Sequence, residues 1–189
     1  MWHDLTRVIN PVLPAYRHGD YADPAVAIRP WATVAQQGFA TQAISLGTQT
    51  GTHIDAPAHF VDGAATLDAL PAAALMGRYR HARGGVVRGE GAILYLDALD
   101  AAPLPEADFV RLLALRLPVW VMAGAATVAG HDDWHLHREL ARAGVYLVED
   151  LDEAAARAIT GPGRIVALPL RLAGTSGAPA RVLAEPDEA

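Results

Sequence analysis

Residues 47–60 read GTQTGTHIDAPAHF and decide how the rest of the chain is interpreted. They place two histidines, an aspartate and a glutamine among small residues that offer little apolar surface to bury. Alternating threonines favour an extended backbone, and alternate side chains of a strand share a face. We therefore expect Gln49, His53 and Asp55 to point the same way, with Gly51 leaving a gap in the row.

This row has the composition of a pocket floor that can hold a small cation. Pro57 prevents a helix from continuing, and the turn that it imposes would bring His59 back toward the row. The alternative is that His53 and Asp55 form a structural hydrogen-bonded pair and that His59 lies on the surface.

A second polar pair lies far along the chain. Glu149 ends an apolar run that reads as a buried strand, and His137 lies near the start of a predicted helix. The helix leads away from His137 by about 10 Å and the strand returns by roughly 16 Å, so both residues can lie at the same end of the unit. A buried glutamate is costly unless it is paired, protonated or metal-bound. The alternative is an exposed Glu149 just beyond the sheet.

Short apolar runs separated by glycine and proline fill most of the chain. Runs at 92–96, 119–123, 145–148 and 165–168 predict buried strands. Helical periodicity predicts helices over 67–75, 106–115 and 133–143, the last with Asp132 or Asp133 as N-cap and Gly144 as its end. The fold class is therefore α/β or α+β. For the tryptophans we expect core packing, with a pocket for an aromatic substrate as the alternative; they are Trp2, Trp31, Trp120 and Trp134.

Composition excludes several classes of protein. A length of 189 residues predicts one domain over 1–189, and 52% hydrophobic with 19% charged residues is typical of a globular protein. A net charge of −6 argues against nucleic-acid and anionic-membrane partners. Since cysteine is absent, any metal must be held by nitrogen and oxygen. The chain start does not resemble a secretory signal, and the most apolar run, 117–130, is too short to span a bilayer, so we expect a cytoplasmic protein.

Several blocks carry a family resemblance. Residues 51–60, GTHIDAPAHF, resemble the signature of the cyclase family of metal-dependent hydrolases, which includes bacterial kynurenine formamidases. The segments 137–140 and 149–151 resemble that family's second ligand block, and their spacing fits. The opening at 4–6 and the glycine-rich end from 168 to 181 are also similar, so the resemblance extends over nearly the whole chain.

The resemblance implies a β-rich α/β fold, a single domain of the swivelling β/β/α type, a homodimer, and one or two divalent metals per subunit, zinc or manganese. It assigns His59 to acid/base chemistry. Gln49 stands where formamidases carry a further histidine, and its neutral amide oxygen is a weaker zinc ligand. We therefore predict one tightly held metal. The candidate metal ligands are His53, Asp55, His137 and Glu149, with Gln49 making a weak contact or none.

The implied reaction is hydrolysis of a small amide, formamide or cyclic amide, as in an arylformamidase. The metal would activate a water molecule and polarise the carbonyl, and His59 would carry the proton to the leaving nitrogen. Two alternatives remain. The metal could promote ring closure or dehydration of a small carbonyl compound, or Gln49 could mark a degenerate member without catalysis.

Overall fold

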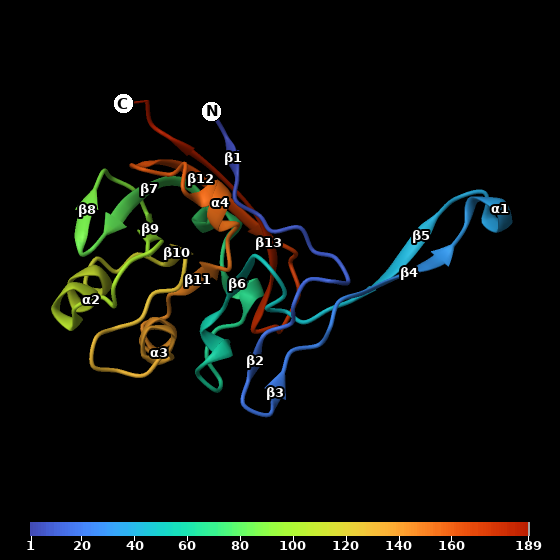
Figure 1. The fold of residues 1–189 in the computed structure, drawn as a ribbon, viewed down its shortest axis with the longest axis horizontal. Helices are drawn as coiled ribbons and strands as arrows, with labels where there is room; N and C mark the ends of the chain where they lie inside the picture. The colour runs from blue at the N-terminus through green and yellow to red at the C-terminus, as the bar shows by residue number, and fades with distance from the viewer. Residues whose placement is uncertain (189) are drawn as a thin grey trace.

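The body of the protein is a β-sheet that closes on itself. The computed structural model describes residues 1–188. Seven strands pair in a ring, because the last of them returns to pair with the first (Figure 1). In spatial order they are β13 (Gly177–Pro186), β12 (Gly163–Pro169), β7 (Met76–Arg83), β9 (Ile93–Asp97), β10 (Val119–Ala123), β11 (Tyr146–Glu149) and β6 (His53–Asp55).

The barrel mixes parallel and antiparallel pairs. Strands β7, β9, β10 and β11 run parallel, whereas β6, β12 and β13 join their neighbours antiparallel. Strand β1 (His3–Asp4) pairs with the far end of β13, and β8 (Val86–Arg88) pairs with the end of β7. The parallel strands all end at one edge, and Glu149 lies there.

Side chains alternate between two apolar clusters, as expected for strands that are buried on both faces. Tyr79, Tyr95 and Val148 belong to the cluster inside the barrel. Trp120 and Leu147 belong to the cluster outside it, under α2 (Glu106–Leu113) and α3 (His135–Arg142). The helices therefore cover one outer side of the barrel, and that side carries the polar residues described below.

The remaining elements are short. Helix α4 (Glu153–Ala156) follows β11, and 3-10 turns span Pro57–His59, Leu67–Ala69 and Ala72–Leu75. A small hairpin joins β2 (Arg17–His18) to β3 (Tyr21–Ala22). Within residues 1–188, no helix has the length and apolar character that crossing a membrane requires.

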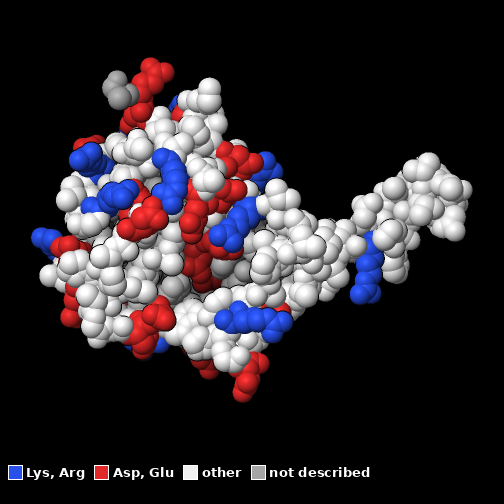
Figure 2. Space-filling model, in the orientation of Figure 1, with Lys and Arg blue, Asp and Glu red and all other residues white. Residues whose placement is uncertain are grey.

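A long hairpin extends away from the barrel. We call it the arm, residues 27–45; it comprises β4 (Ala27–Ala32), α1 (Val34–Gln37) and β5 (Thr41–Ser45) (Figure 1). Figure 2 shows almost no charged surface on it. Large apolar side chains are nevertheless exposed along the arm, namely Ile28, Trp31, Val34, Phe39 and Ile44.

Most predicted elements are confirmed. The four apolar runs form β9, β10, β11 and β12, and the two later helices are α2 and α3, with Gly144 at a φ of 74° after the end of α3. The predicted N-cap of α3 is wrong, because the N-cap residue is Trp134 and not Asp132 or Asp133. The fold is the β-rich, single-domain fold implied by the family resemblance. The predicted helix over 67–75 is wrong, because Pro71 divides it into two 3-10 turns. Core packing is also wrong for Trp2 and Trp31, which are 45% and 81% exposed.

Candidate metal centre

Two neighbouring strands bring the predicted groups together. Strand β6 pairs with β11 so that His53 lies opposite Glu149. Ile54 and Val148 point into the barrel, so the flanking side chains of His53, Asp55 and Glu149 lie on its outer face. The prediction that His53 and Asp55 point the same way is therefore confirmed, since both belong to one short strand.

These three side chains form a compact set of possible ligands. The Nε2 atom of His53 lies 3.4 Å from an oxygen of Asp55 and 3.4 Å from an oxygen of Glu149. One ligand atom from each residue lies within 4.8 Å of the other two. A nitrogen and two carboxylate oxygens at this separation are a donor set that suits a divalent cation.

The ring of His53 is held in one orientation. Its Nδ1 lies 2.7 Å from the carbonyl oxygen of Gly51, which can only accept a hydrogen bond, so Nδ1 carries a proton. The buried Nε2 has no hydrogen-bond partner, although two carboxylates lie at ion-pair distance. Histidines that bind metals commonly donate their other ring nitrogen to a backbone carbonyl in this way.

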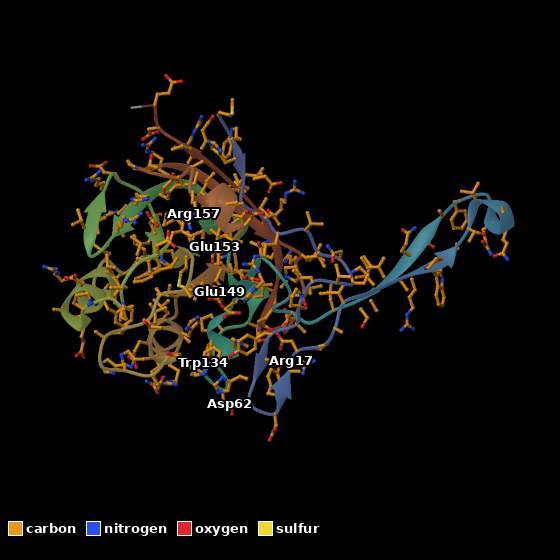
Figure 3. All side chains as sticks on the ribbon, viewed as in Figure 1. Arg17, Asp62, Trp134, Glu149, Glu153 and Arg157 are labelled. Atoms are coloured by element: carbon orange, nitrogen blue, oxygen red, sulfur yellow. The ribbon has the colours of Figure 1, made fainter. Side chains whose placement is uncertain are left out.

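His137 joins the set from helix α3. Its Nε2 lies 2.9 Å from an oxygen of Glu149, and its Nδ1 is buried without a hydrogen-bond partner. Figure 3 labels Glu149, at the end of β11, and Trp134, the residue immediately before α3. The predicted convergence of His137 and Glu149 follows from the short connection between α3 and β11.

The electrostatics favour positive charge between the carboxylates. Burial alone would lower the pKa of His53, but Asp55 and Glu149 raise it well above its ordinary value. Burial likewise opposes ionisation of Glu149, yet His137 and His53 hold the pKa of Glu149 well below its usual range. Protons on the histidines thus balance the carboxylates, and a divalent cation would displace those protons on binding.

His59 lies at the edge of this set. It follows β6 on the 3-10 turn Pro57–His59, and its Nε2 is 4.0 Å from an oxygen of Asp55. The side chain is 32% exposed, whereas those of His53 and Asp55 are each 7% exposed. It therefore faces both the carboxylate and solvent.

Gln49 reaches the set by a different route from the one predicted. Residues 48–52 form turns, with Gly51 at a φ of 60°, so the expected strand over this segment is wrong. The amide nitrogen of Gln49 donates to Asp55 over 3.3 Å, and its oxygen accepts from Thr48. Gln49 thus presents a donor to Asp55, while its oxygen is engaged elsewhere.

The glycine-rich end of the chain makes this contact possible. Ser176 Oγ lies 3.4 Å from the Gln49 amide nitrogen, and a Cβ on Gly177 would lie 2.7 Å from that same nitrogen. Ser176 and Gly177 were not predicted as site residues. Their only signal in the sequence is the glycine-rich composition of the segment.

An aromatic wall borders the set. The ring of Trp134 lies 5.7 Å from Phe60, 5.8 Å from Tyr16 and 5.6 Å from His137. His18 also makes an edge contact with Trp134 at 5.8 Å. Trp134 was predicted as a core residue with a pocket as the alternative, and Phe60, Tyr16 and His18 were not predicted to form this wall because irregular segments carry no periodic signal.

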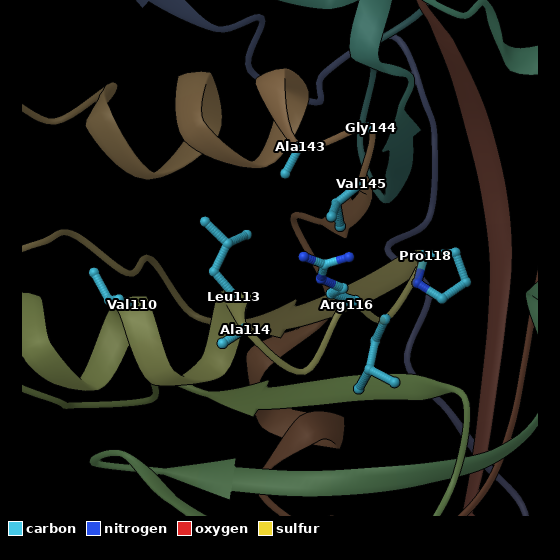
Figure 4. Close-up of a pocket in the computed structure, with 9 residues that line it drawn as sticks. Val110, Leu113, Ala114, Arg116, Pro118, Ala143, Gly144 and Val145 are labelled. Carbon is cyan, nitrogen blue, oxygen red and sulfur yellow. The ribbon is translucent and has the colours of Figure 1, made fainter.

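A cavity of about 620 Å³ lies elsewhere, between the ends of α2 and α3 (Figure 4). Val110, Leu113, Arg116 and Val145 are among the residues that line it. None of the residues of the metal centre borders it, so we do not assign the cavity to the same chemistry.

The chain is similar to a known family and to several solved structures. Residues 3–113 match the family model described as "Putative cyclase", a range that includes His53, Asp55 and His59 but not His137 or Glu149. All of the chain aligns with 99% of a potential metal-dependent hydrolase with cyclase activity, at 25% identity and a TM-score of 0.72.

Two further structures share the fold. Isatin hydrolase A from Labrenzia aggregata is 20% identical, with 100% of this chain and 94% of that chain covered and a TM-score of 0.76. A protein described as a predicted metal-dependent hydrolase from Bacillus stearothermophilus is 24% identical, with 97% of each chain covered and a TM-score of 0.71.

Proposed function

This chain belongs to the cyclase family, and from that premise we propose that it is a metal-dependent hydrolase of a small amide, formamide or cyclic amide. The observation that carries the proposal is the buried Nε2 of His53, which has no hydrogen-bond partner and faces the carboxylates of Asp55 and Glu149. Such an arrangement is costly for a purely structural polar cluster.

The residues present fit a divalent metal, either zinc or manganese. His53, Asp55 and Glu149 would hold it, with His137 beside them, and Gln49 would remain outside because its oxygen accepts from Thr48. Bound there, the cation would polarise a substrate carbonyl and make water a better nucleophile. We propose one metal per subunit.

His59 is the proposed acid/base group. Its Nε2 lies near Asp55 on the solvent side of the set, so it can hold a proton and give it to the leaving nitrogen. Asp55 accepts from the amide of Gln49, which keeps its carboxylate oriented.

The wall of Trp134, Phe60 and Tyr16 favours a substrate with a flat ring. Aromatic rings prefer edge and offset contacts with one another, and these three side chains present ring faces and edges beside the metal centre. We therefore propose an aromatic amide or a lactam fused to an aromatic ring. The structural similarity to isatin hydrolase A supports the same choice.

Elemental analysis tests this function when it is combined with a substrate panel. Protein purified without added metal is analysed for metal and then assayed, with and without manganese or zinc, on N-formylated aromatic amines, isatin-like lactams and oxo-acids. We expect about one metal per subunit and hydrolysis of a lactam or amide. Turnover of the oxo-acids alone would favour ring closure or dehydration, the second candidate, which the similarity to a hydrolase with cyclase activity supports. Absence of bound metal would favour a degenerate member.

We further propose that the protein is a homodimer that uses the arm. A two-stranded hairpin is marginally stable alone in water, and the arm exposes Trp31 and Phe39 at 81% and 58%. A second copy would cover these side chains. The proposed partners are thus a small-molecule substrate and a second copy of the chain.

A further inference from the structure

The two halves of the metal centre meet at the last pair of a strand ladder. The pairing of β6 with β11 ends where His53 lies opposite Glu149. The next residue, Asp150, has a φ of 55°, a left-handed conformation that takes the chain out of the strand. Terminal pairs of a ladder open most easily, so the two groups need additional support.

The side chain of Thr52 supplies that support. Its hydroxyl donates to the carbonyl oxygen of Asp150 over 2.8 Å, at the position where the next pair of the ladder would lie. Thr52 is fully buried and immediately precedes His53, whereas Asp150 immediately follows Glu149. One hydrogen bond therefore links the segments that carry the two groups.

The direction of this bond is determined by the N-terminal segment. The backbone N–H of Arg7 donates to the Thr52 hydroxyl oxygen over 2.9 Å. A hydroxyl has a single proton, and with the oxygen accepting from Arg7 that proton is directed to Asp150. Removing the hydroxyl would leave the Arg7 N–H and the Asp150 carbonyl, both half-buried, without this partner, which costs stability.

Arg7 also holds the loop after β11 from outside. Its Nε donates to the Leu151 carbonyl over 3.2 Å, and its Nη1 lies 3.0 Å from a carboxylate oxygen of Asp150. The N–H of Asp152 donates to the Leu5 carbonyl over 2.9 Å. These contacts hold the loop that follows Glu149 against the N-terminal segment.

We propose that Thr52 is a positioning residue that sets the separation of His53 and Glu149 in the metal centre. This inference rests on the proposed metal-dependent function. The Thr52 hydroxyl bonds to Arg7 and Asp150 and to neither ligand side chain, so its effect passes through the backbone at Asp150 and through the start of β6.

The test compares metal affinity and stability in three variants. Thr52→Val keeps the shape and removes the hydroxyl, and Thr52→Ser restores the hydroxyl. Thr6→Val is the matched control, because the Thr6 hydroxyl accepts from the Val182 N–H over 2.9 Å and donates to its carbonyl over 3.3 Å but makes no bond to residues 150–152. Affinity for Zn²⁺ and Mn²⁺ is measured by competition with a chelator, and stability by thermal unfolding of the metal-free proteins.

We expect Thr52→Val to weaken metal binding by about 10-fold or more, the range seen for outer partners of metal ligands, and Thr52→Ser to recover most of it. Thr6→Val should lose comparable stability and keep its affinity. Equal affinity in Thr52→Val and wild type, or an equal loss in Thr6→Val, would overturn the inference. Wild-type protein that binds neither metal would overturn the proposed function itself, and the inference with it.

If Thr52→Val does not fold, Arg7→Ala provides the measurement, since the Arg7 side chain is 37% exposed. It keeps the Thr52 hydroxyl but releases Asp150 and Leu151, so we expect a loss of metal affinity of a few-fold. Unchanged affinity in Arg7→Ala would contradict the proposed coupling.

Discussion

The carbonyl of Gly51 decides which nitrogen of His53 is available for a metal. Because that carbonyl accepts a hydrogen bond from Nδ1, Nε2 is the ring nitrogen that faces the two carboxylates, and it would bind a metal after losing its proton. A glycine at 51 permits the φ of 60° that turns the carbonyl toward the ring. The motif Gly-Thr-His-x-Asp thus contains the ligand His53, the backbone acceptor that orients it and, in Thr52, the hydrogen bond to the residue that follows β11.

Substitution of His59 should separate proton transfer from metal binding. His59→Ala leaves His53, Asp55 and Glu149 in place, so we expect unchanged metal content and a loss of turnover of roughly 10²–10⁴-fold, as for a general acid–base group. Metal content by elemental analysis and kcat on the best substrate provide the measurement. Loss of stoichiometric metal in this variant would assign His59 to the ligands instead.

Substitution of Gln49 should change the number of metals. The Gln49 amide nitrogen donates to Asp55, and a donor at that carboxylate oxygen opposes a second cation there. We expect one metal per subunit in wild type and a second in Gln49→His, because imidazole is a stronger ligand than an amide. Titration with Zn²⁺ followed by gel filtration and elemental analysis measures this. Two metals at full occupancy in wild type would show that Gln49 does not limit the site.

The site residues were partly accessible to sequence reasoning. His53 and Asp55 share a face because strand alternation holds over three residues. Alternation fails at Gln49, where residues 48–52 turn, yet the side chain still reaches Asp55 through that turn. The Thr52 bond and the Ser176 contact join residues far apart in the chain, and no local pattern predicts such pairs.

Among the secondary structure elements, the predictions were correct where the apolar pattern was long and regular. Continuous apolar runs predicted β9, β10 and β11 because these strands are buried on both faces, and they also predicted β12, in which only alternate residues are buried. The spacing from His137 to Glu149 correctly predicted that the two side chains meet, because α3 and β11 are joined by a short turn through Gly144. Strand order was not predictable from the sequence. Of the seven barrel strands, β6 comes first in the chain and β13 last, yet the two are neighbours in the sheet.

A histidine between strands β7 and β9, His81, should make the stability of the protein depend on pH. His81 on β7 is buried beside Asp97 on β9, with Nε2 3.8 Å from its carboxylate. Burial lowers the pKa of His81 from its ordinary 6.5; Asp97 opposes this shift, and Arg88 and Arg83 add to it. The folded protein therefore binds this proton less readily than the unfolded chain, so stability is lost as pH falls below about 6.5.

Comparison with a neutral replacement isolates this contribution. We expect the free energy of unfolding, measured in urea from pH 8 to pH 5, to fall less steeply in His81→Gln than in wild type. The metal centre titrates in both proteins, so it cancels in the difference. Parallel curves for the two proteins would contradict the lowered pKa of His81.

For the molecule as a whole, the closed barrel buries its apolar side chains, whereas the arm exposes them. The barrel leaves few free strand edges, since β6 pairs with both β11 and β13. The arm buries only Ala32 among the residues of its strands, so it contributes almost nothing to the core. The composition could not predict this difference, because the hydrophobic percentage counts the apolar residues of the arm together with those of the barrel.

Removal of the apolar side chains of the arm should therefore produce a monomer. We expect wild type to sediment as a dimer and the double variant Trp31→Ser with Phe39→Ser to sediment as a monomer with an unchanged circular dichroism spectrum, since both residues lie on the arm and are exposed. Trp2→Ser is the matched control, because Trp2 is 45% exposed but lies on the barrel beside Arg164. It should remain a dimer. A wild type that is monomeric at micromolar concentration, or a double variant that still dimerises, would mean that the arm has another partner or that other surfaces join the subunits.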